Sequence, residues 1–147
     1  MSNPNADTPT MIAPDLSLSE LKENFALLDD WEDRYRYIID LGRKLPAFPE
    51  SLQTEAHKVR GCMSQVWLVP GQSANGDFAF AADSDAHIVK GLVAILGILY
   101  SQQSRDTVLA TDAEAAFHDL GLDQHLSPSR RNGLVAMVQK IKEYAAT

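Results

Sequence analysis

The feature that most constrains the fold is an apolar stretch in the second half of the chain, residues 86–101. Its hydrophobic residues surround most of the helical circumference: Ile88, Val89, Leu92, Val93, Ile95, Leu96, Ile98 and Leu99. A helix that is apolar on all sides is a buried one. The stretch is shorter than the roughly 20 residues that a membrane span requires, and Lys90 interrupts it. The sequence therefore predicts a central helix that other elements must cover.

Three short segments before this helix have the pattern of strands. They span residues 57–60, 65–69 and 77–82. Gly61-Cys62 lies at the first junction and Asn75-Gly76 at the second, and residues that tolerate positive φ favour tight turns there. Because the three segments follow one another without an intervening helix, they predict a three-stranded antiparallel sheet.

Helical patterns flank these strands on both sides. Before them, Ser17 and Glu20 have the spacing of a capping box, and a second helix begins after Asp29 or Asp30 and ends before Pro46. After them, three acidic or hydroxyl residues, Asp83, Ser84 and Asp85, are expected to cap the central helix. Two further helices are expected at residues 112–120 and from Ser127-Pro128 onward. Strands grouped between helices indicate an α+β fold with helices packed on the sheet.

Length and charge limit the classes of function that this chain can have. A chain of 147 residues suits one domain, which we place at residues 16–147 after a disordered tail at residues 1–15. The tail has neither the basic start nor the apolar segment of a signal peptide or anchor, so we expect a cytoplasmic protein that does not bind membranes. A net charge of −7 argues against nucleic acid as a partner, since phosphate binding needs clustered Lys and Arg.

Cys62 is the only cysteine of the chain. One cysteine cannot form an internal disulfide or supply the thiolates of a zinc or iron-sulfur site, and the four histidines have no metal-ligand spacing. We therefore expect no metal and no other cofactor. His57, Lys58 and Arg60 precede the thiol, and positive charge of this kind favours a reactive thiolate. The residues alone leave a reactive and a structural cysteine both open.

Two other interpretations of the thiol follow from the residue types. Cys62 could be the nucleophile of a hydrolase, with His57 or His125 as its base. The sequence lacks the papain-type signature around the cysteine, and no segment marks an oxyanion hole. Alternatively, the chain could act without covalent chemistry, as an adaptor that activates an enzyme by binding it.

Several separated motifs resemble the SufE family of cysteine-desulfurase partner proteins, nearly end to end. They are Asp30-Trp31-Glu32-x-x-Tyr35, Gly61-Cys62-x-Ser64-Gln65-Val66-Trp67, Asp83-Ser84-Asp85-Ala86-x-Ile88-Val89-Lys90-Gly91-Leu92 and His125-Leu126-Ser127-Pro128-Ser129-Arg130. The resemblance implies a fold shared with IscU-type scaffolds. Met63 departs from the family, in which Gln is common at this position.

The resemblance also implies a function centred on Cys62. The thiol would accept persulfide sulfur from a SufS-type cysteine desulfurase, stimulate that enzyme, and pass the sulfur to the SufBCD scaffold complex for iron-sulfur cluster assembly. Such a chain is a sulfurtransferase-type persulfide carrier without turnover of its own. The alternatives are a CsdE-like partner of a CsdA-type desulfurase and a non-catalytic desulfurase activator.

Four more residues are candidates for loop positioning or partner binding, by the same resemblance. Gly61 would let the corner flex, and Ser64 follows the thiol in the motif. Asp85 would help to hold the loop, and Arg130 would pair with this region or with the partner. For Asp85 and Arg130, an ordinary charge at a helix terminus is the competing interpretation.

Overall fold

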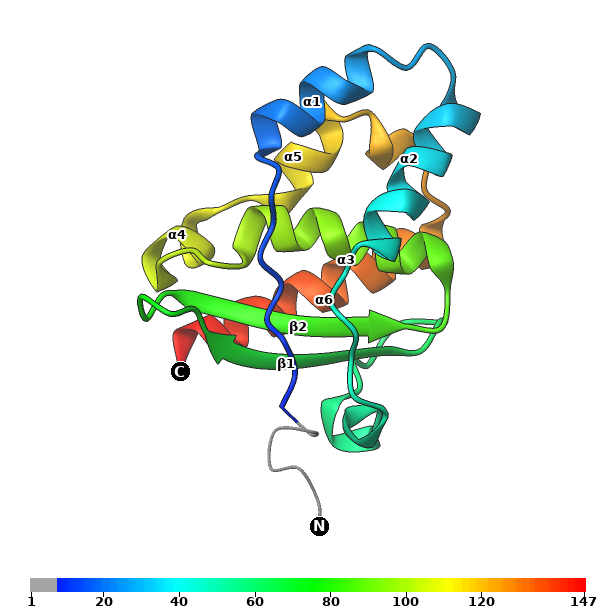
Figure 1. Ribbon diagram of the computed structural model, residues 1–147. Helices are drawn as coiled ribbons and strands as arrows, with labels where there is room; N and C mark the ends of the chain where they lie inside the picture. The colour runs from blue at the N-terminus through cyan, green and yellow to red at the C-terminus, as the bar shows by residue number, and fades with distance from the viewer. Residues whose placement is uncertain (1–7) are drawn as a thin grey trace.

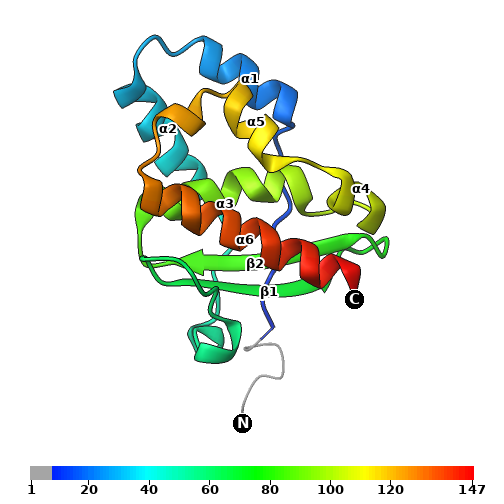
Figure 2. The same ribbon diagram turned by 180° about the vertical axis from the view of Figure 1, so that it is seen from behind.

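The computed structural model describes residues 8–147 as helices packed on a two-stranded antiparallel sheet. The predicted mixture of helix and antiparallel sheet is confirmed. The α-helices and strands are α1 (Leu18–Ala26), α2 (Trp31–Arg43), β1 (Val66–Gln72), β2 (Phe78–Ser84), α3 (His87–Tyr100), α4 (Arg105–Ala110), α5 (Ala113–Asp119) and α6 (Pro128–Ala146). Figures 1 and 2 show α3 between the sheet and the pair α1 and α5; in the view of Figure 1, α2 lies in front of α3 and α6 behind it.

The sheet has two strands, so the prediction of a three-stranded sheet is wrong. β1 and β2 form a hairpin in which Val66 pairs with Ser84 and Gln72 pairs with Phe78. The predicted turn is present, and Gly76 has a φ of +86° there. The β-rich segments at the second and third predicted positions are therefore strands, and each is longer than expected.

The segment predicted as the first strand makes only local pairing with β1. Residues Glu55–His57 form a 3-10 turn, Lys58 forms an isolated bridge with Trp67, and the Val59 N–H donates to the Val66 carbonyl at 2.8 Å. Gly61 then turns the chain at a φ of +90°. The turns on both sides leave too few extended residues for a ladder, which explains the error.

The N-terminal segment covers the other edge of β2. The Ile12 N–H donates to the Phe80 carbonyl at 2.8 Å, and the Ile12 side chain is only 4% exposed. Ile12 packs against Gly97 of α3, where a Cβ would lie 2.6 Å from the Ile12 Cγ2. The expected tail thus differs from the structure at residues 8–15, because an apolar side chain there fills a site in the core. Residues 1–7 of that expected tail lie outside the described residues.

α3 is the buried central helix that the sequence predicts. Eleven of its residues are buried: Val89, Gly91, Leu92, Val93, Ala94, Ile95, Leu96, Gly97, Ile98, Leu99 and Tyr100. α2 crosses it closely, since a Cβ on Gly42 would lie 2.6 Å from the Gly91 nitrogen. Within residues 8–147, no helix has both the length and the apolar character needed to cross a membrane.

The expected side-chain cap of α3 is absent. The N-cap is Ala86, which has no side-chain cap hydrogen bond, and Ser84 Oγ accepts from the Ala86 N–H at 3.2 Å. Asp83 instead accepts from Gln53 and pairs with Lys90. The prediction is wrong because the N-cap lies one residue beyond the three expected capping residues, and their side chains bond to the Ala86 N–H, to Gln53 and Lys90, and to the Gln65 N–H.

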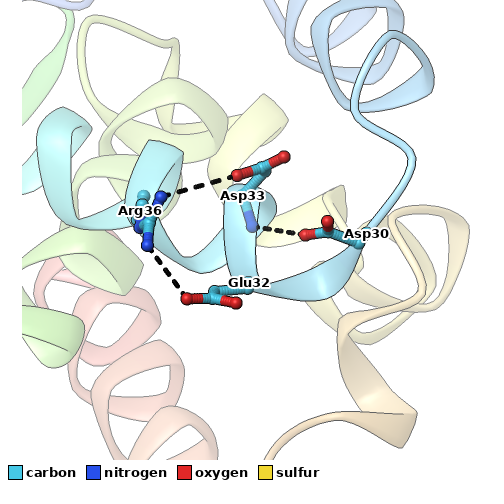
Figure 3. Close-up of polar contacts among 4 residues, drawn as sticks. All are labelled: Asp30, Glu32, Asp33 and Arg36. Atoms are coloured by element: carbon cyan, nitrogen blue, oxygen red, sulfur yellow. Dashed lines mark hydrogen bonds and ion pairs between the residues drawn. The ribbon is translucent and has the colours of Figure 1, made fainter.

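The other helix termini follow local sequence signals. The Ser17–Glu20 capping box of α1 is present. Figure 3 shows the start of α2, where Asp30 Oδ1 accepts from the Asp33 N–H at 2.9 Å and Arg36 pairs with Glu32.

The second half of the chain contains one α-helix, α4, that the sequence did not predict. Ser127 caps α6 with Pro128 in its first turn, and Gly121 follows α5 with a φ of +75°, as expected. α4 was not predicted, because its six residues are too few to display a helical period.

Candidate functional site

Cys62 lies on a short loop that is fixed at both ends. Before the loop, the Val59 N–H donates to the Val66 carbonyl. After the thiol, Asp85 Oδ1 accepts from the Gln65 N–H at 3.0 Å, and the Asp85 N–H donates to the Gln65 carbonyl at 3.2 Å. The side chain and the backbone N–H of Asp85 therefore both bond to the backbone of Gln65, at the end of the cysteine loop.

The loop rests on small residues of α6. Cys62 Sγ lies 3.6 Å from the Gly133 carbonyl oxygen, as a weak S–H donor. A Cβ added to Gly133 would lie 3.4 Å from Sγ, and one added to Gly61 would lie 3.4 Å from the Ala136 Cβ. Both distances are ordinary van der Waals contacts, so the loop touches the helix without being interlocked with it.

Burial controls the protonation of the thiol. Cys62 is half-buried against α6, and this desolvation raises the pKa of the thiol above its ordinary value. Arg60 lies 3.0 Å from the carboxylate of Glu55, and Lys58 lies 3.8 Å from it. The preceding cations therefore do not produce the lowered pKa that the sequence suggests, and the resting thiol is protonated at neutral pH.

A cavity of about 380 Å³ opens beside Cys62. It brings the thiol together with two of the predicted candidates, Ser64 and Arg130. Gly61 and Asp85 do not line it, although both belong to or touch the same loop. The rest of the wall consists of Met63 beside the thiol, of apolar or small residues of β1, α3 and α6, and of two serines near the start of α6: Val66, Val89, Leu92, Gly133, Met137, Ser127 and Ser129.

Among residues 8–147, no histidine lines this cavity. His57 Nδ1 lies 3.1 Å from the Leu52 carbonyl oxygen, within the preceding loop. His125 stacks on Trp31, with ring centroids 3.7 Å apart. Neither ring is placed as a base for the thiol, so the geometry does not favour the Cys-His hydrolase.

Residues 8–147 also contain no cluster of three His, Cys, Asp or Glu side chains that could hold a metal ion. The chemistry that the cavity offers is that of one thiol, hydroxyl groups and a guanidinium. This set suits nucleophilic attack by sulfur and the binding of a small anionic group.

The sequence analysis missed two residues that shape the site. Gly133 provides the seat for the thiol, and its signal was a glycine inside an otherwise helical pattern, which commonly has a packing reason. Ser129 Oγ lies 2.9 Å from the Met63 Sδ and holds the tip of the loop over α6. No local pattern indicated this contact, because 66 positions separate the two residues.

Known proteins are similar to this chain over most of its length. The sequence model of the SufE family, described as an Fe-S metabolism associated domain, matches residues 19–145. A protein of Rhizobium etli named as an uncharacterized SufE-like protein is 48% identical over 132 residues, covering 88% of this chain and 89% of the relative. A protein of Rhizobium meliloti with the same description is 46% identical over 132 residues, covering 88% and 94%.

A solved structure has the same fold. It is the solution structure of a hypothetical protein from Thermus thermophilus, with a TM-score of 0.70 and 21% sequence identity, covering 88% of this chain and 93% of that chain. At this identity the likeness concerns the fold alone.

Proposed function

This chain belongs to the SufE family, which is linked to iron-sulfur metabolism, and from that premise we propose that Cys62 is a sulfur carrier. It takes sulfane sulfur from the persulfide of a SufS-type cysteine desulfurase, stimulates that enzyme, and delivers the sulfur to the SufBCD scaffold complex. The observation that carries this proposal is the placement of the only thiol of the chain, on a loop beside a cavity that holds no competing nucleophile of its kind.

The transfer step needs only this one thiol. The Cys62 thiol loses its proton and attacks the terminal sulfur of the desulfurase persulfide. The S–S bond of that persulfide breaks, a new S–S bond forms on Cys62, and the desulfurase cysteine leaves as a thiolate and takes up a proton. The sulfane sulfur keeps its oxidation state, so no oxidant is consumed. With no second cysteine in the chain, the product cannot collapse into an internal disulfide.

The resting position of Cys62 suits a carrier that must not react on its own. Burial raises the pKa of the thiol, and oxidation requires the thiolate and exposure, so the docked loop protects the sulfur. Transfer requires the loop to leave α6. Gly61, at a φ of +90°, supplies the backbone freedom for this movement, and departure from α6 restores the solvation that favours the thiolate.

The other candidate residues make contacts that suit them to assist the transfer. Asp85 holds the loop through the Gln65 N–H, so it sets how easily the loop is released. Ser64 and Arg130 line the cavity beside Sγ, where a hydroxyl and a guanidinium can stabilise the anionic end of a persulfide or contact the partner.

The test is intact-mass analysis after incubation with L-cysteine and a desulfurase, with parallel reactions for SufS-type and CsdA-type enzymes. We expect one added sulfur atom on the wild-type chain, removed by dithiothreitol and absent from Cys62→Ser. The desulfurase type that gives this product identifies the partner.

Two results would contradict the carrier proposal. One is the absence of added sulfur with both active desulfurases. The other is full stimulation of the desulfurase by Cys62→Ser, which would make the chain a non-catalytic activator.

A further inference from the structure

Met63, next to the thiol, is the most exposed of the large hydrophobic residues in the described part of the chain. It is 87% exposed, against 80% for Leu27 and about half or less for the others. Its Sδ is held by Ser129 Oγ, so the side chain stands at the mouth of the Cys62 cavity. Any protein that brings a reacting atom to Sγ must therefore meet Met63.

A second hollow adjoins the other side of the same loop. It has a volume of about 210 Å³ and contains three cations, Lys58, Arg60 and Lys140; we call it the basic hollow. Arg60 directly precedes Gly61, and Ala136, which also lines the hollow, lies 3.4 Å from where a Cβ on Gly61 would be, so the hollow adjoins the cysteine loop.

The charge of this hollow is opposite to that of the whole chain. Arg60 and Lys58 share one carboxylate, that of Glu55, at 3.0 and 3.8 Å. Lys140 lies 3.9 Å from Glu143. Three cations therefore face two carboxylates, on a chain whose net charge is −7. Such a local excess is felt by an approaching macromolecule, because these side chains are at or near the surface.

We propose that Met63 and the basic hollow together form the surface that docks the desulfurase, an inference that rests on the proposed function. Met63 is the apolar anchor, and the three cations guide the approach. The complementary surface on the desulfurase is an apolar socket with an acidic rim around its persulfide. Methionine is enriched at interfaces and adapts its shape to a partner, while charges at the rim act mainly on the association rate.

The anchor is tested by substituting Met63 and measuring sulfur transfer against the concentration of the carrier chain. Met63→Glu should raise the half-saturating concentration about tenfold or more, as expected for loss of an interface anchor. Met63→Leu should stay within about twofold of wild type, because it keeps the apolar contact. Leu27→Glu is the matched control, since Leu27 is similarly exposed and lines neither hollow.

The guiding role is tested by charge reversal and salt. Arg60→Glu and Lys140→Glu should lower the association rate several-fold at low ionic strength and flatten its dependence on salt. Arg36→Glu is the control: Arg36 is also exposed and paired with carboxylates, at 2.9 and 3.8 Å, but it lines neither hollow. The same effect with all three variants would show a dependence on net charge alone and overturn the guiding role.

Reaction of Cys62 with iodoacetamide separates docking from chemistry. The alkylation rate of each variant gives its effect on the thiol itself, since Met63→Glu loses the Ser129 contact that holds the loop. A docking defect is the change in half-saturation or association rate that exceeds this effect. If Met63→Glu matches Leu27→Glu in half-saturation, the docking surface is wrong while the carrier function stands. If wild-type chain gains no sulfur from either desulfurase type, the proposed function fails first.

Discussion

Two places in this protein have a glycine where another segment approaches a helix, and they differ in the space around that glycine. Where α2 crosses α3, a Cβ on Gly91 would collide with the Ile38 carbonyl oxygen, and one on Gly42 would lie 2.6 Å from the Gly91 nitrogen. Where the cysteine loop meets α6, a Cβ on Gly133 would lie 3.4 Å from Cys62 Sγ, an ordinary contact.

The difference separates a scaffold contact from a reversible one. The two helices are in contact through backbone atoms that cannot move without disturbing the core, so that crossing is fixed. The loop touches α6 through side chains, with one weak S–H contact at Cys62 and the contact between Ser129 Oγ and Met63 Sδ, and it can withdraw at small cost. The carrier thus combines a rigid helix pair with a thiol that is only lightly held.

The largest expected effect comes from adding a methyl group at Gly91, compared with the same addition at Gly133. Gly91→Ala should lower the free energy of unfolding by about 3 kcal/mol or more, because the new atom overlaps backbone that has no room to relax. Gly133→Ala should change it by about 1 kcal/mol at most and in the stabilising direction, since Ala favours a helix over Gly and its Cβ fits. Urea unfolding monitored by circular dichroism measures both; equal losses would remove the contrast.

Much of the scaffold could be predicted because its signals are local. The apolar circumference of residues 86–101, the Ser17 capping box and the Asn75-Gly76 turn each fix a conformation within a few residues. The prediction of a first strand at residues 57–60 was wrong for the opposite reason. Whether residues 57–60 pair along their length depends on the turns at both ends and on the position of β1. A short alternation of apolar and polar residues does not indicate either of these.

The site also has features that the local sequence predicts and features that depend on distant residues. Cys62 could be identified because it is the only cysteine and lies in a recognisable motif. Its raised pKa could not, because the desolvation comes from α6, some 70 positions away, and because Glu55 pairs with the nearby cations. Ile12 shows the same limit: its burial depends on Gly97, far along the chain.

A smaller effect is expected from matched substitutions at two glycines with positive φ. Gly61 and Gly76 have φ values of +90° and +86°, so valine at either position should cost a similar 1–3 kcal/mol, roughly, in unfolding free energy. Gly61→Val should also slow sulfur transfer from the desulfurase several-fold, because the loop can no longer swing away from α6. Gly76→Val, in the distant hairpin turn, should not. Single-turnover transfer at saturating desulfurase distinguishes them, and unchanged transfer by Gly61→Val would remove the flexing role.

The smallest effect concerns the contact that holds the loop. Asp85→Ala removes the acceptor of the Gln65 N–H and should cost about 1 kcal/mol of stability. Asp85→Asn keeps an acceptor oxygen and is the matched control.

The more informative readout of this pair is the pH dependence of Cys62 alkylation. Burial raises the pKa of the folded thiol, so wild-type alkylation should rise only above the pH at which an unfolded thiol ionises. For the same reason, wild-type stability should fall as pH increases through the ordinary thiol pKa towards the raised one, and Cys62→Ser should lack this fall. Asp85→Ala frees the loop and should move the alkylation midpoint down, towards the ordinary value, whereas Asp85→Asn should leave it in place. A midpoint that is the same in wild type and Asp85→Ala would mean that the lightly held state of the loop depends on α6 alone.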